Sequence, residues 1–97
     1  MAEVIGGEES LPVTLLFFAK ARDLVGSSRR DIHLPFADPV RIRGSELKKL
    51  LLELFPSLIS IADSFVLAVN LQYADLDDIV HLSGGVEIAV IPPLSGG

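Results

Sequence analysis

The residues with the clearest chemical potential lie at the end of the sequence, where residues 92–97 read Pro-Pro-Leu-Ser-Gly-Gly. Glycine has no Cβ, so a Gly-Gly end can enter a channel that any side chain would block. The two prolines stiffen the root of this segment because each fixes its own φ. The pattern predicts an arm that carries the carboxyl group of Gly97 into the active site of another protein. The alternative is an ordinary frayed terminus.

A carboxylate at this position needs activation before it can do acyl chemistry. An α-carboxyl group has a pKa of about 3.3–3.7, so it is anionic at neutral pH and a poor electrophile. The simplest activation forms an acyl-adenylate from ATP. The sequence offers no nucleotide site of its own, so we expect a separate activating enzyme. The activated glycyl carbonyl can then accept an amine, or a sulfur atom to give a thiocarboxylate.

Other groups in the chain are weaker candidates for chemistry. His33 and His81 lie in strand patterns without a second ligand at useful spacing. The aspartates at 75, 77 and 78 lack the glycine and closing glutamate of a calcium loop. Gly84-Gly85 precedes a strand pattern, whereas a phosphate-binding loop precedes a helix. We therefore expect no metal site and no internal active site.

Composition narrows the function classes further. The chain has 97 residues, a formal net charge of −5 and no cysteine. An acidic chain without a basic cluster is a poor nucleic-acid binder. Without cysteine there is no disulfide, thiol nucleophile or Cys-based zinc site. The sequence also shows no signal peptide and no membrane-spanning run, which leads us to expect a cytoplasmic protein.

Hydrophobic periodicity predicts one main helix. Leu47, Leu50, Leu51 and Leu54 recur at the spacing of one helical face. We expect Ser45 to cap the start of this helix and Pro56 to end it. Residues 20–25 are expected to form only a short helical turn.

The remaining apolar segments predict strands. Residues 12–19 and 86–91 are apolar at nearly every position, which is typical of central strands buried on both faces. Residues 29–34 alternate as a strand with one solvated face. Further strands are expected at 40–42, 65–70, 72–74 and 79–82.

This order of elements predicts an α+β fold of the ubiquitin-like β-grasp type. In that fold a small mixed sheet curls around one main helix, with the first and last strands adjacent and parallel. A ferredoxin-like fold would need a second long helix, for which 20–25 is too short. We divide the chain into a disordered lead-in (1–11), a β-grasp domain (12–91) and a flexible Gly-Gly tail (92–97).

Three segments resemble a known family. Residues 87–97 (EIAVIPPLSGG), residues 16–26 (LFFAKARDLVG) and residues 67–70 (LAVN) with Gln72 are similar to the small, sulfur carrier subunit of molybdopterin synthase. The Pro-Pro-x-Ser-Gly-Gly end distinguishes this family from the related sulfur carriers of thiamine synthesis and tRNA thiolation. The resemblance extends from about residue 13 to residue 97.

The resemblance implies a mechanism in which the small subunit is a carrier and is not catalytic alone. Its terminal glycine is adenylated by an ATP-dependent activating enzyme and converted to a thiocarboxylate. The tail then enters the large catalytic subunit, where sulfur passes to a pterin precursor, precursor Z, and forms the dithiolene of molybdopterin. The family forms a heterotetramer of two small and two large subunits. No cofactor is bound stably, since the sulfur is carried covalently.

The family roles transfer to positions that match its motifs. Gly97 bears the adenylate and then the sulfur, and Gly96 provides clearance. The remaining positions are the partner-docking residues Phe18 and Ile91 and the inserted arm of Pro92, Pro93, Leu94 and Ser95. The absence of cysteine fits a carrier that holds sulfur on its main chain.

The sequence departs from the family pattern in one place. Val86 stands where the family usually has Asp before the glutamate of the last strand, and we expect this to alter a turn more than the chemistry. The segment 75–83 also looks slightly longer than in short members. Two alternatives stay open: another ubiquitin-like sulfur carrier or protein modifier, and a non-catalytic β-grasp binding module.

Overall fold

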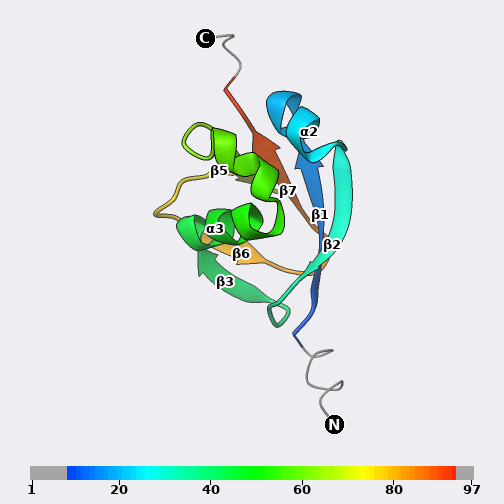
Figure 1. The fold of residues 1–97 in the computed structure, drawn as a ribbon. Coiled ribbons are helices and arrows are strands. Elements are labelled where there is room, and N and C mark those ends of the chain that lie inside the picture. The colour runs from blue at the N-terminus through cyan, green and yellow to red at the C-terminus, as the bar shows by residue number, and fades with distance from the viewer. Residues whose placement is uncertain (1–8, 94–97) are drawn as a thin grey trace.

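The structure, a computed structural model, describes residues 9–93. Figure 1 shows a sheet with helices on one side and the first and last strands side by side. In chain order the elements are β1 (Leu11–Phe17), α2 (Ala19–Val25), β2 (Arg29–Leu34), β3 (Val40–Arg43), α3 (Gly44–Leu54), the 3₁₀ helix η1 (Pro56–Ile61), β4 (Val66–Val69), β5 (Gln72–Ala74), β6 (Ile79–Leu82) and β7 (Val86–Ile91).

The main sheet has five strands in the order β2-β1-β7-β4-β5. β1 and β7 are parallel, with Leu15 beside Ile88, although they lie at opposite ends of the chain. The pairs β1–β2, β4–β7 and β4–β5 are antiparallel. The predicted β-grasp, with its first and last strands adjacent and parallel, is confirmed.

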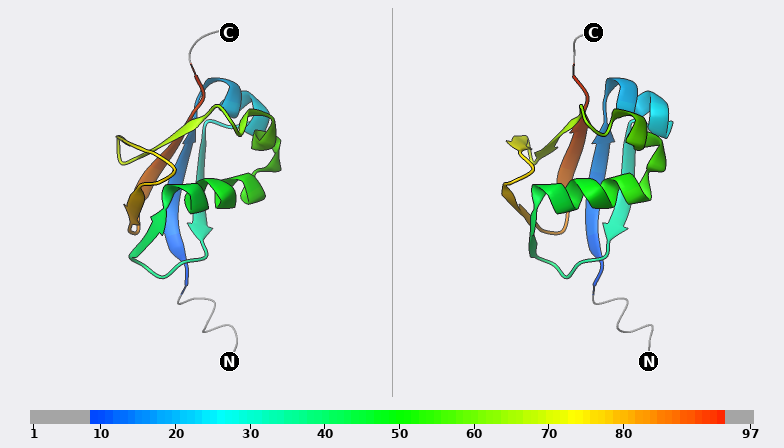
Figure 2. Two further views of the ribbon diagram at one scale, coloured as in Figure 1. Left: turned by 90° about the vertical axis from the view of Figure 1, so that its left-hand side faces the viewer. Right: turned by 60° about the vertical axis from the view of Figure 1, so that its left-hand side comes forward.

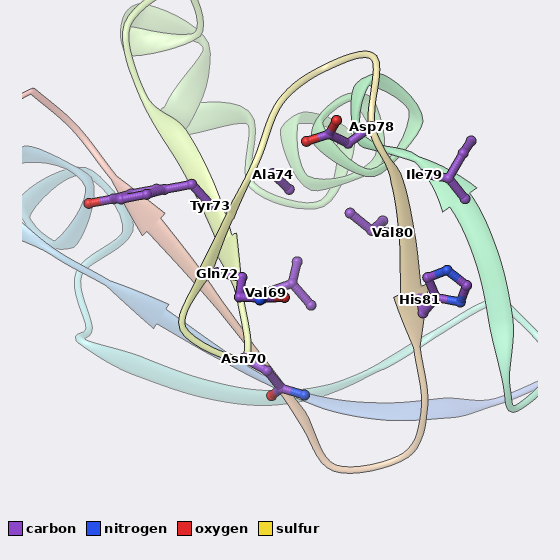
Figure 3. A pocket seen from close by; sticks show the side chains of 9 residues that line it. All are labelled: Val69, Asn70, Gln72, Tyr73, Ala74, Asp78, Ile79, Val80 and His81. Atoms are coloured by element: carbon purple, nitrogen blue, oxygen red, sulfur yellow. The ribbon is translucent and has the colours of Figure 1, made fainter.

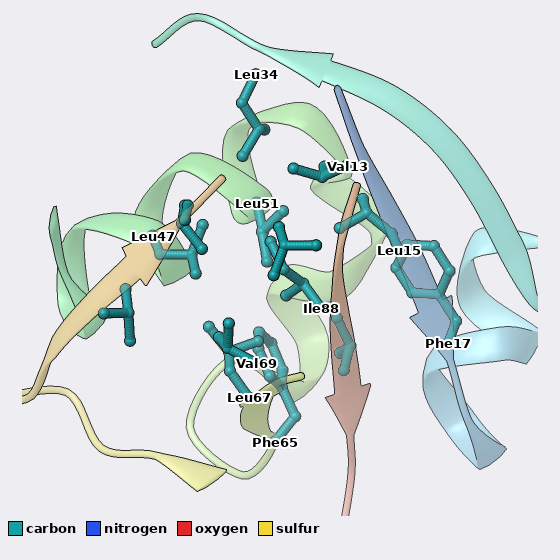
Figure 4. Close-up of a cluster of buried hydrophobic side chains, with 14 of the residues drawn as sticks. Val13, Leu15, Phe17, Leu34, Leu47, Leu51, Phe65, Leu67, Val69 and Ile88 are labelled. Carbon is teal, nitrogen blue, oxygen red and sulfur yellow. The ribbon is translucent and has the colours of Figure 1, made fainter. Parts of the chain in front are cut away.

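Helix α3 lies across one face of this sheet, the inner face, as both views in Figure 2 show. Leu47 and Leu51 of its apolar stripe are fully buried, whereas Leu54 at its C-terminal end is exposed. Burying one such side chain stabilises the fold by about 1.5–3 kcal/mol. Figure 4 shows this stripe packed on inward residues of the strands. These include Val13, Leu15, Phe17, Leu67, Val69 and Ile88, and Phe65, just before β4, belongs to the same cluster.

The other face of the sheet, the outer face, carries no helix, as both views in Figure 2 show. The residues of β1 and β7 alternate between fully buried side chains and half-buried or exposed ones. The prediction that both strands are buried on both faces was therefore wrong, although both are central in the sheet. Their second apolar set faces outward, and a partner protein can cover such a set as well as a second layer of helices can.

Helix α3 begins two residues earlier than predicted. The helix starts at Gly44 with Arg43 as its N-cap, so the prediction of Ser45 as N-cap was wrong. Backbone carbonyls satisfy the first N–H groups: Gly44 donates to Asp78 (2.7 Å) and Ser45 to Leu76 (2.9 Å). The loop before β6 thus supplies the hydrogen-bond acceptors that a capping side chain would otherwise provide.

Several smaller elements complete the fold. β3 and β6 form a separate two-stranded antiparallel sheet, which the sequence did not predict. Pro56 follows the end of α3 as predicted, but it also opens η1, which was not predicted. The short helix α2 was predicted, and Gly26 ends it in the left-handed conformation (φ 91°) that glycine adopts easily. Val86, at the position that departs from the family pattern, is the first, buried residue of β7.

Candidate docking face and tail root

An apolar patch occupies the outer face of the sheet. The register places Leu16, Ala89, Ala68 and Tyr73 in one row across four strands. A second row pairs Ile91 of β7 with Val66 of β4. With Phe18 and Leu71, which follow β1 and β4, these residues define the docking face. The set is Leu16, Phe18, Val66, Ala68, Leu71, Tyr73, Ala89 and Ile91.

Exposure of large apolar side chains is the main feature of this face. Phe18 is 47% exposed, whereas its neighbour Phe17 is 1% exposed in the core. Tyr73 is 74% exposed, and Ile91 is half-buried. A hollow of about 240 Å³ lies between Phe18, Leu71 and the strands. Contiguous exposed apolar surface of this kind marks an interaction site.

A row of polar residues across β2, β1 and β7 borders one end of the docking face. Asp31 accepts a hydrogen bond from the Thr14 hydroxyl (2.8 Å) and forms an ion pair with Arg29 (3.4 Å). Glu87 is exposed beside Thr14 in the parallel register and lines the hollow. An apolar centre with a polar rim is the usual anatomy of a protein–protein interface.

The turn between β4 and β5 supplies one end of the docking face. Val69 pairs with Gln72, so Asn70 and Leu71 form a two-residue loop, and both have positive φ (49° and 71°). The turn is fixed to β7, because the Asn70 N–H donates to the Glu87 carbonyl (2.8 Å) and the Glu87 N–H donates to Asn70 Oδ1 (3.0 Å). The tip of the turn therefore has a fixed place on the sheet.

The root of the tail adjoins the docking face. Ile91 is the last residue of β7 and belongs to the face. Pro92, which the sequence assigned to the flexible tail, is buried, and Pro93 is exposed. A second hollow of about 570 Å³ lies beside this root, between Val66, Tyr73 and the two prolines. The predicted arm and carrier residues Leu94, Ser95, Gly96 and Gly97 lie outside the described residues.

Sequence reasoning named two residues of the docking face, Phe18 and Ile91, through the family resemblance, and their docking role stays a prediction. It missed Leu71, Tyr73 and Val66. The signal was available in part, because a strand was predicted at 72–74 and Tyr73 is its central residue. The identity of the exposed face follows only from the strand register.

The histidines and aspartates considered in the sequence analysis are exposed or make contacts within the fold. His33 shares a hydrogen bond with Ser10 (2.7 Å), and His81 is exposed on β6. The Asp75 N–H donates to the Asp78 carboxylate (2.8 Å), which closes the loop between β5 and β6. Within residues 9–93, no cluster of His, Asp or Glu side chains is suitable for a metal ion. No helix in the same range is long and apolar enough to span a membrane.

A third hollow, of about 320 Å³, separates β5 from β6 (Figure 3). Val69 and Val80 are among the residues that line it, together with Asn70 and Gln72. The hollow lies beside the outward edges of the two sheets, because β5 pairs only with β4 and β6 only with β3. It lacks a cluster of polar side chains pointing at one place, so it does not resemble a catalytic site.

Comparison with known proteins decides the family. A sequence model of the ThiS family matches residues 15–97. The chain belongs to the ThiS family. Within it, the chain is 47% identical over 92 residues to the molybdopterin synthase sulfur carrier subunit of Aedes aegypti, a match that covers 93% of each chain. The corresponding subunit of Caenorhabditis briggsae is 40% identical over 88% of this chain and 96% of the relative.

Solved structures of other proteins share the fold of this chain. The small archaeal modifier protein SAMP1 of Haloferax volcanii aligns with a TM-score of 0.65 at 21% identity, over 89% of this chain and 99% of that one. A putative molybdopterin converting factor subunit 1 of Pyrococcus furiosus aligns with a TM-score of 0.63 at 24% identity, over 88% and 100%. At these sequence identities the structural similarity supports the β-grasp fold and nothing about function.

Proposed function

We propose that this chain is the sulfur carrier subunit of molybdopterin synthase and that Gly97 carries the sulfur. The observation that carries the proposal is the continuity of the docking face with the tail root at Ile91 and Pro92. A partner that covers Phe18 and Tyr73 would receive the tail at the edge of the same contact. The curated relatives, which bear this name over nearly the whole chain, support the same assignment.

The proposed chemistry takes place on the Gly97 carboxyl group. Its oxygen attacks the α-phosphorus of ATP, which releases pyrophosphate and leaves a glycyl-adenylate. Hydrosulfide delivered by a sulfur donor then attacks the glycyl carbonyl and AMP leaves, so a thiocarboxylate remains. In the large subunit the thiocarboxylate sulfur displaces an oxygen substituent of the pterin precursor, and water then cleaves the acyl–sulfur bond, which leaves the sulfur on the pterin and returns Gly97 to a carboxylate. Gly96 and Gly97 keep the entering segment narrow enough for a channel.

The domain itself serves two partners in turn. The activating enzyme and the large subunit both need the tail, so both must dock close to its root, and their contacts overlap on the docking face. We propose one large subunit for each carrier, arranged as a heterotetramer of two and two. A cytoplasmic location is part of the same proposal, because both partners and ATP must be available there.

Intact-mass measurement tests the proposal directly. The protein is incubated with ATP, an activating enzyme and a sulfur donor, and we expect the mass change of one oxygen-to-sulfur exchange, localised at Gly97. A chain lacking Gly97 is the control and should show no exchange. Absence of exchange in the full chain would remove the proposed function.

Two further readouts separate the alternatives. The thiolated protein, mixed with a large subunit and the pterin precursor, should yield molybdopterin. Exchange without molybdopterin formation would indicate a carrier for thiamine or tRNA, and an isopeptide bond to a lysine would indicate a protein modifier. A non-catalytic binding module would keep its binding after deletion of Gly97.

A further inference from the structure

Leu71 combines two unfavourable features. Its φ of 71° lies in the left-handed region, where a bulky side chain is an outlier and where this type of hairpin turn prefers glycine. Its side chain is also 93% exposed, the most exposed large apolar residue of those described. A glycine would relieve the backbone strain and remove the exposed apolar surface. The fold of the domain alone therefore gives no reason for a leucine here.

Strain and exposure at one residue point to a role outside the fold. Strained residues persist where the surrounding structure fixes them, and they cluster at functional sites. Here the surrounding structure is the pair of hydrogen bonds between Asn70 and Glu87, which ties the turn to β7. Leu71 is thus presented in a fixed position at the rim of the hollow, together with Phe18.

Glu87 is the second unusual residue of this border. Its backbone forms the clamp to Asn70, while its exposed side chain lines the same apolar hollow. The ion pairs of the described chain join Arg22 with Asp23 and Arg29 with Asp31, so none of them neutralises Glu87. A carboxylate that borders an apolar contact surface selects for a cation on the protein that covers it.

We propose that Leu71 and Glu87 form a two-point selectivity element for the large subunit. Leu71 enters an apolar pocket of that subunit, and Glu87 pairs with a lysine or arginine beside the pocket. The proposal rests on the proposed function, because it names the partner of the same face. The clamp holds both residues in place before binding, which lowers the cost of ordering them and slows dissociation.

The choice between the two partners follows from the relatives. They are named as the sulfur carrier subunit of molybdopterin synthase, so the other subunit of that synthase is the partner that their name implies. No activating enzyme is implied in this way. We therefore assign Leu71 and Glu87 to the large subunit rather than to the activating enzyme.

Binding measurements with the purified large subunit test this proposal. We expect Leu71→Gly to raise the Kd about 10- to 30-fold. The same variant should unfold at an equal or higher temperature, because glycine suits the turn, so weaker binding would not reflect unfolding. A second variant, Leu71→Ala, tests the same contact with a change that can be matched elsewhere. Its control is Ile59→Ala, since Ile59 is an exposed apolar residue on η1, away from the docking face. The control should bind like the natural chain.

Glu87 has its own readout. Glu87→Gln should raise the Kd about 3- to 10-fold and weaken the dependence of the association rate on salt. Unchanged Kd values for Leu71→Gly, or an unchanged salt dependence for Glu87→Gln, would overturn the proposal. It would also be overturned if both variants lost affinity only for the activating enzyme.

The sulfur exchange at Gly97 separates this proposal from the proposed function. If the natural chain exchanges oxygen for sulfur and yields molybdopterin, the function stands whatever the two variants show. With the function established in this way, a Leu71→Gly variant that binds the large subunit like the natural chain overturns only the selectivity element.

Discussion

Phe17 and Phe18 are neighbours in the sequence and belong to opposite faces of the sheet. Phe17 packs at an angle on Phe55, with ring centroids 5.2 Å apart, inside the core that α3 and η1 cover. Phe18 lies in the docking face, where the described chain leaves it 47% exposed. Both faces are apolar, so composition does not distinguish them. The difference is whether the chain supplies its own cover or leaves that to another protein.

This comparison has a thermodynamic consequence. Apolar residues of the inner face contribute to the free energy of unfolding, because they leave water when the chain folds. Apolar residues of the docking face contribute mainly to the free energy of association, because they leave water only when a partner binds. Substitutions that separate the two quantities can therefore test the assignment of each face.

The largest effect is expected for Phe17→Ala. This substitution leaves a cavity in the core and should lower the free energy of unfolding by about 3–5 kcal/mol. The matched substitution Phe18→Ala should cost less than about 1 kcal/mol, because the side chain is already half exposed. Chemical denaturation of both variants checks the pair. Similar losses in the two would mean that Phe18 belongs to the core.

Phe18→Ala should instead weaken partner binding. Truncating a large aromatic side chain that a partner buries typically costs about 2–3 kcal/mol of affinity. We therefore expect the Kd for the large subunit to rise about 30- to 100-fold. Titration calorimetry against Leu76→Ala, an exposed apolar residue in the loop beside α3, provides the control. An unchanged Kd for Phe18→Ala would remove this residue from the docking face.

The two faces also differ in how far the sequence predicts them. The helix was predictable because Leu47, Leu50 and Leu51 recur at helical spacing, and that period has few other causes. The parallel pair of β1 and β7 followed from two strongly apolar segments and one long helix. The sequence did not predict which face of the sheet Leu16 and Ala89 occupy, because the apolar pattern is the same whether a helix or a partner protein covers the residue.

The sequence also failed where backbone groups replace side chains. Ser45 has the right side chain for an N-cap, but the carbonyls of Asp78 and Leu76 satisfy the helix start instead. That contact joins residues about thirty positions apart, and no local pattern announces it. Leu71 was missed for a different reason: its exposure depends on the register of β4 with β5.

A substitution at Gly44 tests the contact that holds α3 over the inner face. A Cβ at this position would overlap the backbone carbonyl oxygen of Asp75, so α3 and the loop before β6 would have to move apart. We expect Gly44→Ala to lower the free energy of unfolding by about 1–3 kcal/mol. Gly84→Ala is the matched control, because its Cβ would meet no backbone atom: the near contact is with the side chain of Asp38, and Pro12 lies at an ordinary contact distance. Equal stability of the two variants would show that the loop yields freely, and the affinity of the docking face should be unchanged in both.

The smallest effect concerns Lys48, at the edge of the inner face. Its Nζ donates a hydrogen bond to the Phe65 carbonyl (3.2 Å) and lies 4.4 Å from the centroid of the Phe65 ring. Partial burial lowers the pKa of this amine below its ordinary value of 10.5, and the nearby Asp63 carboxylate acts in the opposite direction. The folded state thus disfavours the charged amine relative to the unfolded state.

The sign of the pH dependence follows from this shift. Below the folded pKa the amine is charged in both states, and the fold bears the full desolvation cost. As the pH rises from the folded pKa towards 10.5, the unfolded state binds more protons, so the free energy of unfolding increases. Lys48→Arg stays charged throughout and should lack this increase. Lys49→Arg, at an exposed position on the same helix, should follow the natural chain. Parallel curves for the natural chain and Lys48→Arg in alkaline denaturation experiments would show that Lys48 is fully solvated and lies outside the covered face.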